Sequence, residues 1–189
     1  TTALTKRLDA SWVTGTNQGG LSSSLTIGNN DYYIHLIRVA GVDDAGFDTS
    51  LTAANLITDH GATAYRAIGW IKRVGGTIVA FHTYELTGGG IEMNWDSPTV
   101  DISRSAGTAL STARVTDAVK VPLNFSTVAH ISAIAQDSTT VQSVHICCPD
   151  QTDAAPSQTV APLFNLLAGG SISANAEQRK IRTSSTGTI

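Results

Sequence analysis

Short runs of apolar residues, alternating or continuous, recur along the whole chain between clusters of Gly, Asn, Asp and Ser. This rhythm is typical of an all-β protein. Because exposed strand edges must be closed or covered, many short strands joined by Gly-rich turns favour an antiparallel β-sandwich of jelly-roll type over an open sheet. The clearest runs, each expected to form a strand, are residues 32–39, 65–74, 77–86, 127–135, 141–147 and 159–167.

Gly75 and Gly76 join two of these runs, and both tolerate positive φ. A connection of two such residues is the signature of a tight hairpin, so runs 65–74 and 77–86 are expected to pair antiparallel. Both strands of this hairpin carry large side chains on both faces. One face is therefore expected to pack on the core and the other to meet a neighbour.

Helix is nearly absent from the pattern. Residues 52–57 are expected to form one turn, capped by Ser50 or Thr52 and ended by Gly61, and the whole chain is expected to hold at most one or two short helical turns. No shift in composition marks a linker, so residues 1–189 are expected to form a single domain. The longest loop candidates are 87–90, 101–112 and 149–157.

Hydroxyl groups rather than charges make this chain polar. Only 14% of residues are charged, well below the roughly 25% of ordinary soluble domains, whereas 43 residues are Ser or Thr. This balance suits protomers that bury much surface against each other, because charged residues are depleted at interface cores. The net charge of -3 without a basic cluster argues against nucleic-acid binding, and no apolar run approaches the ~18 residues of a membrane span.

The two cysteines, Cys147 and Cys148, are neighbours in the sequence. Adjacent cysteines pair poorly because the small ring strains the disulfide, which excludes a disulfide-stapled secreted scaffold. They end an apolar run without a neighbouring cation or helix N-terminus, so we expect buried, inert thiols. No signal peptide is visible, which favours assembly in a reducing cytosol.

Histidines and carboxylates invite a catalytic or metal-binding interpretation, but their spacing does not support one. No two histidines stand at ligand spacing; His130 and His145 lie in adjacent predicted strands, where they could meet across a ladder. We expect imidazoles that hydrogen-bond on a sheet face or at an interface. The five histidines are His35, His60, His82, His130 and His145.

Some acidic residues collect in two clusters, and neither cluster has the spacing of a calcium loop. We expect them to stabilise turns, and neither a metal nor another cofactor is predicted. A pair of glycosidase carboxylates stays open, because that interpretation depends on distances. No nucleophile elbow, phosphate loop or dinucleotide fingerprint is present, so the chain is predicted not to be an enzyme. The clusters are Asp43, Asp44 and Asp48, and Glu92, Asp96 and Asp101.

A succession of motifs in the first half of the chain resembles the β-rich distal domain of tailed-bacteriophage tail fibres and virion spikes. The resemblance covers residues 6–85, and residues 119–122 and 177–183 show weaker similarity to the same family. It implies a homo-oligomer, expected to be a trimer, that is assembled in the bacterial cytoplasm and carried on the virion beside other virion proteins. It leaves open that the chain is a fragment of a longer fibre or spike. The motifs are 9–21 (DASWVTGTNQGGL), 31–38 (DYYIHLIR), 42–50 (VDDAGFDTS), 52–56 (TAANL) and 65–71 (YRAIGWI).

The function that follows is a non-enzymatic virion structural domain that contacts a glycan or protein of the host surface. A capsid decoration or head-spike protein is the first alternative. A carbohydrate-binding module, in which aromatics such as Trp12, Trp70, Trp95 or Tyr84 stack on sugars, is the second. A tailspike-like depolymerase is the third, and it depends only on the acidic clusters.

Receptor contacts are expected on loops, because rigid sandwiches usually present binding residues on connections that vary without disturbing the core. The predicted loops are 87–96 and 101–112. Trp95 is the main candidate, as an exposed indole after a Gly run; the competing interpretation places it in a subunit interface. The predicted contact residues are Glu92, Trp95, Asp96 and Arg104.

Overall fold

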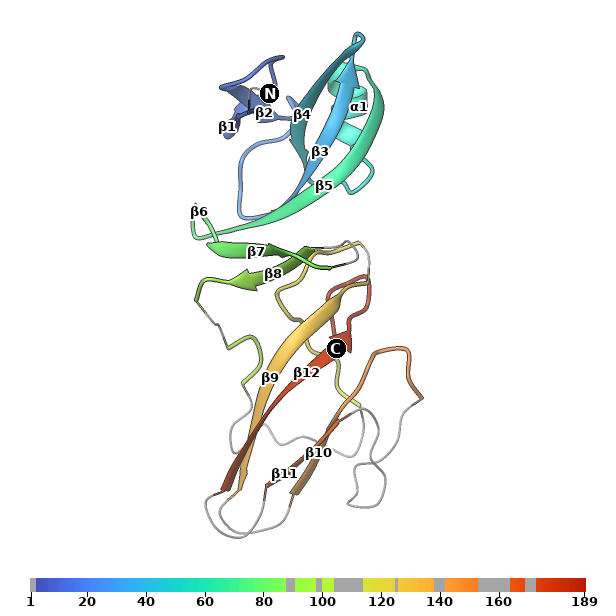
Figure 1. The fold of residues 1–189 in the computed structure, drawn as a ribbon. Helices are drawn as coiled ribbons and strands as arrows, with labels where there is room; N and C mark the ends of the chain where they lie inside the picture. Colours follow the sequence, from blue (N-terminus) through green and yellow to red (C-terminus); the bar gives the residue numbers. More distant parts are fainter. Residues whose placement is uncertain are drawn as a thin grey trace. The chain divides into compact units, whose positions relative to one another are not determined.

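A computed structural model of the chain shows an all-β protein, as the apolar pattern predicts (Figure 1). It divides into two compact units, Thr1–Pro98 and Thr99–Ile189. The predicted single domain stays a prediction. The residues that the structure describes are 3–87, 91–97, 100–103, 114–124, 126–137, 142–152, 164–168 and 173–189.

The first unit is built on a six-stranded sheet with the order β1-β2-β4-β3-β5-β6. Strands β3, β4, β5 and β6 pair antiparallel, whereas β1 and β2, and β2 and β4, pair parallel. The jelly-roll sandwich is therefore not confirmed. The strands are β1 (Lys6–Ser11), β2 (Gln18–Leu21), β3 (Asp31–Val39), β4 (Val42–Asp48), β5 (Ala62–Val74) and β6 (Thr77–Ile78).

Both faces of this sheet carry apolar side chains, because residues of β3 alternate between them. One cluster gathers around buried Tyr32, and the other around Ile37, which packs with Leu56 of helix α1 (Ala54–His60). In Figure 1, α1 lies against the sheet. The buried members of the two clusters are Leu8, Leu21, Tyr32, Phe47 and Ile71, and Ile37, Ala53, Leu56 and Ala62.

The predicted helical turn is confirmed, but its predicted cap is wrong. Ala53 occupies the N-cap with a φ of 53° and no capping side chain. The carboxylate of Asp48, at the end of β4, instead accepts the backbone N–H groups of Asn55 (2.9 Å) and Leu56 (3.0 Å). Gly61 ends the helix in a left-handed conformation, as predicted.

The glycine hairpin is also confirmed, with φ of 59° at Gly75 and 85° at Gly76. Its strands pair over only two positions, whereas most of β5 pairs with β3. The expected long pairing of 65–74 with 77–86 is therefore wrong. The chain leaves the sheet after Ile78 and forms a separate ribbon of β7 (Phe81–Glu85) and β8 (Ile91–Trp95).

The second unit contains two antiparallel strand pairs, and buried Ile181 is the centre of its apolar cluster. Strand β9 (Val128–Asp137) pairs with β12 (Ser173–Arg182), and β10 (Gln142–Ile146) pairs with β11 (Phe164–Ala168). His130 and His145, which could have met across a ladder, pair with other residues: His130 is opposite Lys180, and His145 is opposite Asn165. Residues packed against Ile181 are Ile131, Ala133, Val144, Ile146, Cys148 and Ile189.

Candidate functional site

The β7–β8 ribbon holds three of the four predicted contact residues. Residues 91–95 form a strand, so the prediction that Glu92 and Trp95 lie on a loop is wrong. The register places Tyr84 opposite Glu92, and Phe81 opposite Trp95 on the other face. Asp96 follows the strand directly, and its backbone N–H extends the pairing by donating to the carbonyl of Ala80 (3.0 Å).

Trp95 is half-buried in an aromatic cluster of the first unit. Its ring makes edge contacts with Trp70, at a centroid distance of 5.7 Å, and with Phe81, at 6.4 Å. Because Trp70 is buried in the main sheet, this cluster attaches the ribbon to that sheet. The expected free, exposed indole is therefore wrong, and a receptor contact through Trp95 stays a prediction.

The opposite side of the ribbon is polar and surrounds an exposed aromatic ring. Tyr84 is 54% exposed. Opposite it, Asn94 Nδ2 donates to Glu92 Oε1 (3.0 Å), and beside it His82 Nε2 donates to Asp96 Oδ1 (2.9 Å). We call this surface, formed by His82, Tyr84, Glu92, Asn94 and Asp96, the polar ribbon face. It offers one ring for stacking and several acceptors whose positions hydrogen bonds restrain.

Arg104, the remaining predicted contact residue, lies outside the described residues, as does most of the predicted loop 101–112. Asp101 is described, and it accepts the backbone N–H of Lys120 (2.9 Å) and pairs with its ammonium group (3.0 Å). The second acidic cluster is thus divided, since Glu92 and Asp96 belong to the first unit.

The first acidic cluster serves the fold. Asp44 is buried, forms an ion pair with Lys6 (2.7 Å) and accepts the backbone N–H of Gly15 (3.0 Å). Asp43 forms a bidentate pair with exposed Arg38, which lowers the pKa of that carboxyl. Together with the role of Asp48 in capping α1, these contacts favour the structural interpretation. In the part of the chain that the structure describes, no group of three or more His, Cys, Asp or Glu residues is placed to hold a metal ion.

His35 is completely buried in the main sheet. Its Nε2 donates to the carbonyl of Ser50 (3.0 Å), while Nδ1 has no hydrogen-bond partner. The rings of Tyr33 and Tyr65 pack against it. Burial lowers the pKa of His35, so the neutral imidazole is favoured.

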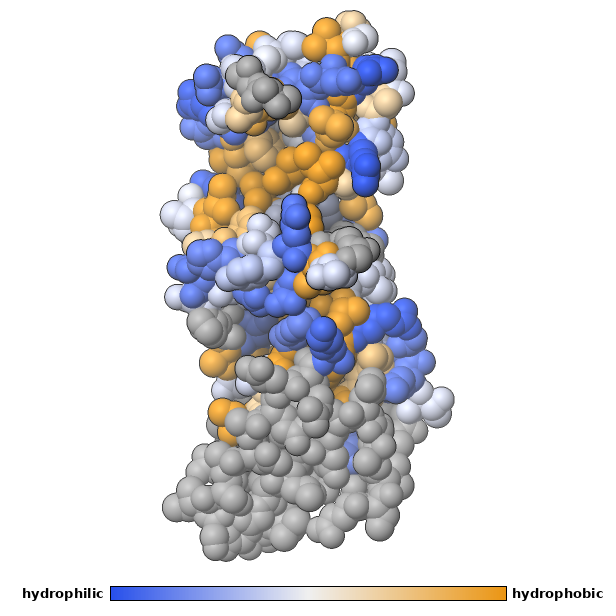
Figure 2. Space-filling model, viewed as in Figure 1, coloured by the Kyte–Doolittle hydropathy of each residue, from blue (hydrophilic) through white to orange (hydrophobic). Residues whose placement is uncertain are grey.

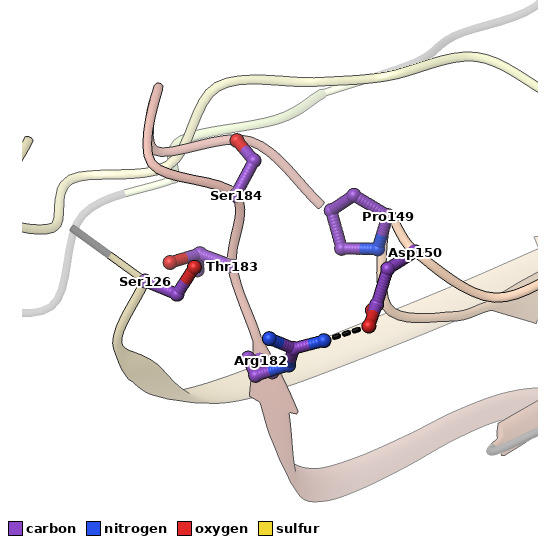
Figure 3. A pocket seen from close by; sticks show the side chains of 6 residues that line it. All are labelled: Ser126, Pro149, Asp150, Arg182, Thr183 and Ser184. Carbon is purple, nitrogen blue, oxygen red and sulfur yellow. Dashed lines mark ion pairs between the residues drawn. The ribbon is translucent and has the colours of Figure 1, made fainter. Parts of the chain in front are cut away.

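A cavity of about 180 Å³ lies in the second unit, beside an ion pair between Arg182 and Asp150 (Figure 3). Two of its hydroxyl groups bond within the surrounding loops: Thr183 bonds with Thr127, and Ser184 with Thr188. These two hydroxyl groups and the ion pair therefore hold the walls of the cavity together. The lining residues are Ser126, Pro149, Asp150, Arg182, Thr183 and Ser184.

Both cysteines are free thiols, as predicted, but they are half-buried rather than buried. The absence of a neighbouring cation, inferred from the sequence, is also wrong. Arg114, 33 residues away, donates from Nη2 to Cys147 Sγ at 3.2 Å. Only the tertiary fold brings these two residues together.

No family model, no curated protein and no solved structure matches the chain. Among the described residues, no helix has the length and apolar character that a membrane crossing requires.

Proposed function

We propose that this chain is a non-enzymatic structural protein of a tailed-phage virion. It acts as a homo-oligomeric tail-fibre or spike domain that contacts a glycan of the host surface through the polar ribbon face. The observation that carries the host contact is the exposed ring of Tyr84 among acceptors restrained by hydrogen bonds. Aromatic rings stack on the C–H faces of sugars, and carboxylate and amide groups bind sugar hydroxyls.

The virion context is supported by the motif resemblance of residues 6–85. In the structure these motifs build β3, β4, α1 and β5, and they include buried Tyr32 and the capping residue Asp48. The resembling residues are thus mainly those that determine the fold of the first unit. They support a shared scaffold, whereas the contact surface is formed by exposed side chains outside these motifs.

The oligomer is supported by the outer edge of β5. Strand β6 covers only Arg73 and Val74 of that edge, and the rest has no neighbouring strand among the described residues. Tyr65 and Ile68 are exposed there, and Leu36 is exposed on adjacent β3. Figure 2 shows apolar residues gathered on the visible side of the first unit. An exposed apolar strand edge is a template for pairing with another chain, so a second copy that covers it would protect it from aggregation.

The host contact is tested with Tyr84→Ala and a matched control, Thr83→Ala. Thr83 is also exposed but belongs to the opposite face of the ribbon. Binding of labelled protein to host cells is expected to weaken about tenfold or more in Tyr84→Ala, a loss of ~1.4 kcal/mol, with the oligomer mass unchanged. The control is expected to bind like the wild type, and equal binding by all three proteins would contradict the proposal.

The three alternative functions predict different results with virions, with the purified protein and with host polysaccharide. A capsid decoration or head-spike protein would place antibody label on the capsid in electron micrographs of virions, whereas a fibre or tail spike would place it on the tail. A carbohydrate-binding module also accounts for the exposed Tyr84, but it would bind its polysaccharide as a monomer. A depolymerase would release new reducing ends from host polysaccharide.

A further inference from the structure

We propose that Cys147 is a thiol-modification site for small-molecule disulfides, activated by Arg114, and that the adjacent Cys148 is a structural residue. The two thiols follow β10 directly, and the fold gives them different surroundings. This inference is independent of the proposed host contact, which involves the other unit of the chain.

The guanidinium group of Arg114 is held in place by the turn that follows the cysteines. Its Nη1 donates to the carbonyl of Pro149 (2.9 Å), and its Nη2 donates to the carbonyl of Gln151 (2.7 Å). The turn itself is closed by the backbone N–H of Gln151, which donates to the carbonyl of Cys148 (3.0 Å). Anchored in this way, Nη2 lies 3.2 Å from Cys147 Sγ.

Cys148 differs from Cys147 in its contacts. It packs against the apolar cluster around Ile181, together with Val144 and Ile146. Its backbone N–H donates to Oε1 of Gln151 (3.0 Å), which restrains the main chain at that position. Cys148 is therefore a natural internal control, because it has the same side chain and a neighbouring position but an apolar environment.

An arginine beside a thiol favours the thiolate, which is the nucleophile in disulfide exchange. Arginine keeps its charge at all pH values at which proteins are folded, so this effect does not depend on a second titrating group. The Cys147 thiolate attacks one sulfur of the disulfide, and a bond between Sγ and that sulfur forms as the original S–S bond breaks. The departing sulfur takes the electron pair and leaves as a thiolate, which water protonates; the disulfide is the oxidant.

The experiment uses the full chain with one cysteine at a time. Cys148→Ala retains Cys147, and Cys147→Ala retains Cys148. Each is mixed with dithiodipyridine, a neutral disulfide whose thiopyridone product absorbs light. At about pH 7, Cys147 is expected to react roughly tenfold or more faster than Cys148. Equal rates, or a faster Cys148, would overturn the proposal.

Arg114→Gln in the Cys148→Ala background tests the activating cation. The rate is expected to fall several-fold at about pH 7 and to change little at about pH 9, where an ordinary thiol is already largely ionised. A purely structural effect of Arg114 would change both rates alike and would overturn the assigned role. The Cys148→Ala chain alone provides a check that needs no arginine variant. In the folded chain, the rate at about pH 7 divided by the rate at about pH 9 must exceed the same quotient for the chain unfolded in urea. A quotient at or below that of the unfolded chain would also overturn the role of Arg114.

Discussion

The carboxylate of Asp48 links β4 to α1 at the level of a single side chain. It is fully buried and accepts hydrogen bonds from the backbone N–H groups of Ser50, Asn55 and Leu56 and from the Asn55 amide. Hydrogen bonds to a buried charged group are worth more than neutral ones, and their donors become unsatisfied when the acceptor is removed.

Asp48→Ala is therefore expected to lower the free energy of unfolding by about 3 kcal/mol, measured by urea denaturation. Asp43→Ala is the control, because Asp43 is an aspartate of the same strand, but its carboxylate forms an exposed ion pair with Arg38. Exposed ion pairs contribute about 0–1 kcal/mol, so the control should unfold nearly like the wild type. Equal losses in the two variants would contradict the capping role.

Burial of His35 predicts a pH dependence of stability. Its folded-state pKa is lowered from 6.5, so the unfolded chain binds the proton more readily than the folded chain does. Stability is therefore expected to fall as the pH drops below about 6.5 and to keep falling down to the lowered pKa. The groups that face the ring are the carbonyl of Ser50, the carboxylate of Asp48 and the rings of Tyr33 and Tyr65.

The measurement is the urea midpoint between about pH 7 and pH 5, in the wild type and in His35→Gln. Glutamine does not titrate and keeps a donor for the Ser50 carbonyl, so part of the pH dependence should disappear. The remainder is expected to come from His60, whose pKa burial also lowers. An identical slope in both proteins would show that His35 does not titrate in this way.

At the scale of elements, the hairpin between β5 and β6 depends on the left-handed conformation of Gly75 and Gly76. Gly76→Val is expected to lower the free energy of unfolding by roughly 1 kcal/mol or more, because a β-branched residue is strained at positive φ. Gly75→Asn is the matched control, since asparagine tolerates a φ near 59°. Unfolding midpoints in urea should separate the two variants; an unaffected Gly76→Val would contradict the turn conformation.

Strand prediction succeeded where the residues of one apolar run enter the core of a single sheet. It failed for the run 77–86, which is divided between β6 and β7, and it missed a strand that pairing alone makes. The run 32–39 corresponds to β3, because its alternate residues enter the two cores of the sheet. Strand β4 was not predicted, since its sequence, VDDAGFD, contains three aspartates and a glycine. It is a strand because it lies between β2 and β3, where Lys6 neutralises Asp44 and α1 covers Asp48.

At the scale of the whole molecule, the edge of β5, which no strand among the described residues covers beyond β6, predicts an oligomer. Light scattering at micromolar concentration is expected to give a multiple of 19.7 kDa. Ile68→Lys should reduce that mass without unfolding the protomer, because Ile68 is 48% exposed beside the uncovered edge and a buried charge is costly there.

Val13→Lys is the control, since Val13 has similar exposure but lies outside the strands of the sheet. It should leave the mass unchanged. A wild-type mass near 19.7 kDa would contradict the oligomer, and an unchanged mass for Ile68→Lys would place the interface elsewhere.

The sequence by itself determined the all-β class, the glycine turn and the C-terminal end of α1, because these depend on local backbone preferences and short-range periodicity. Only the tertiary structure decided which carboxylate caps α1, which aromatic ring of the ribbon is exposed, and which thiol has a cation beside it. Each of these depends on residues distant in the chain that meet in space: Trp95 packs on Trp70 and leaves Tyr84 exposed, and Arg114 reaches Cys147. Such meetings are set by strand pairing and core packing, which a local pattern of apolar and polar residues does not encode.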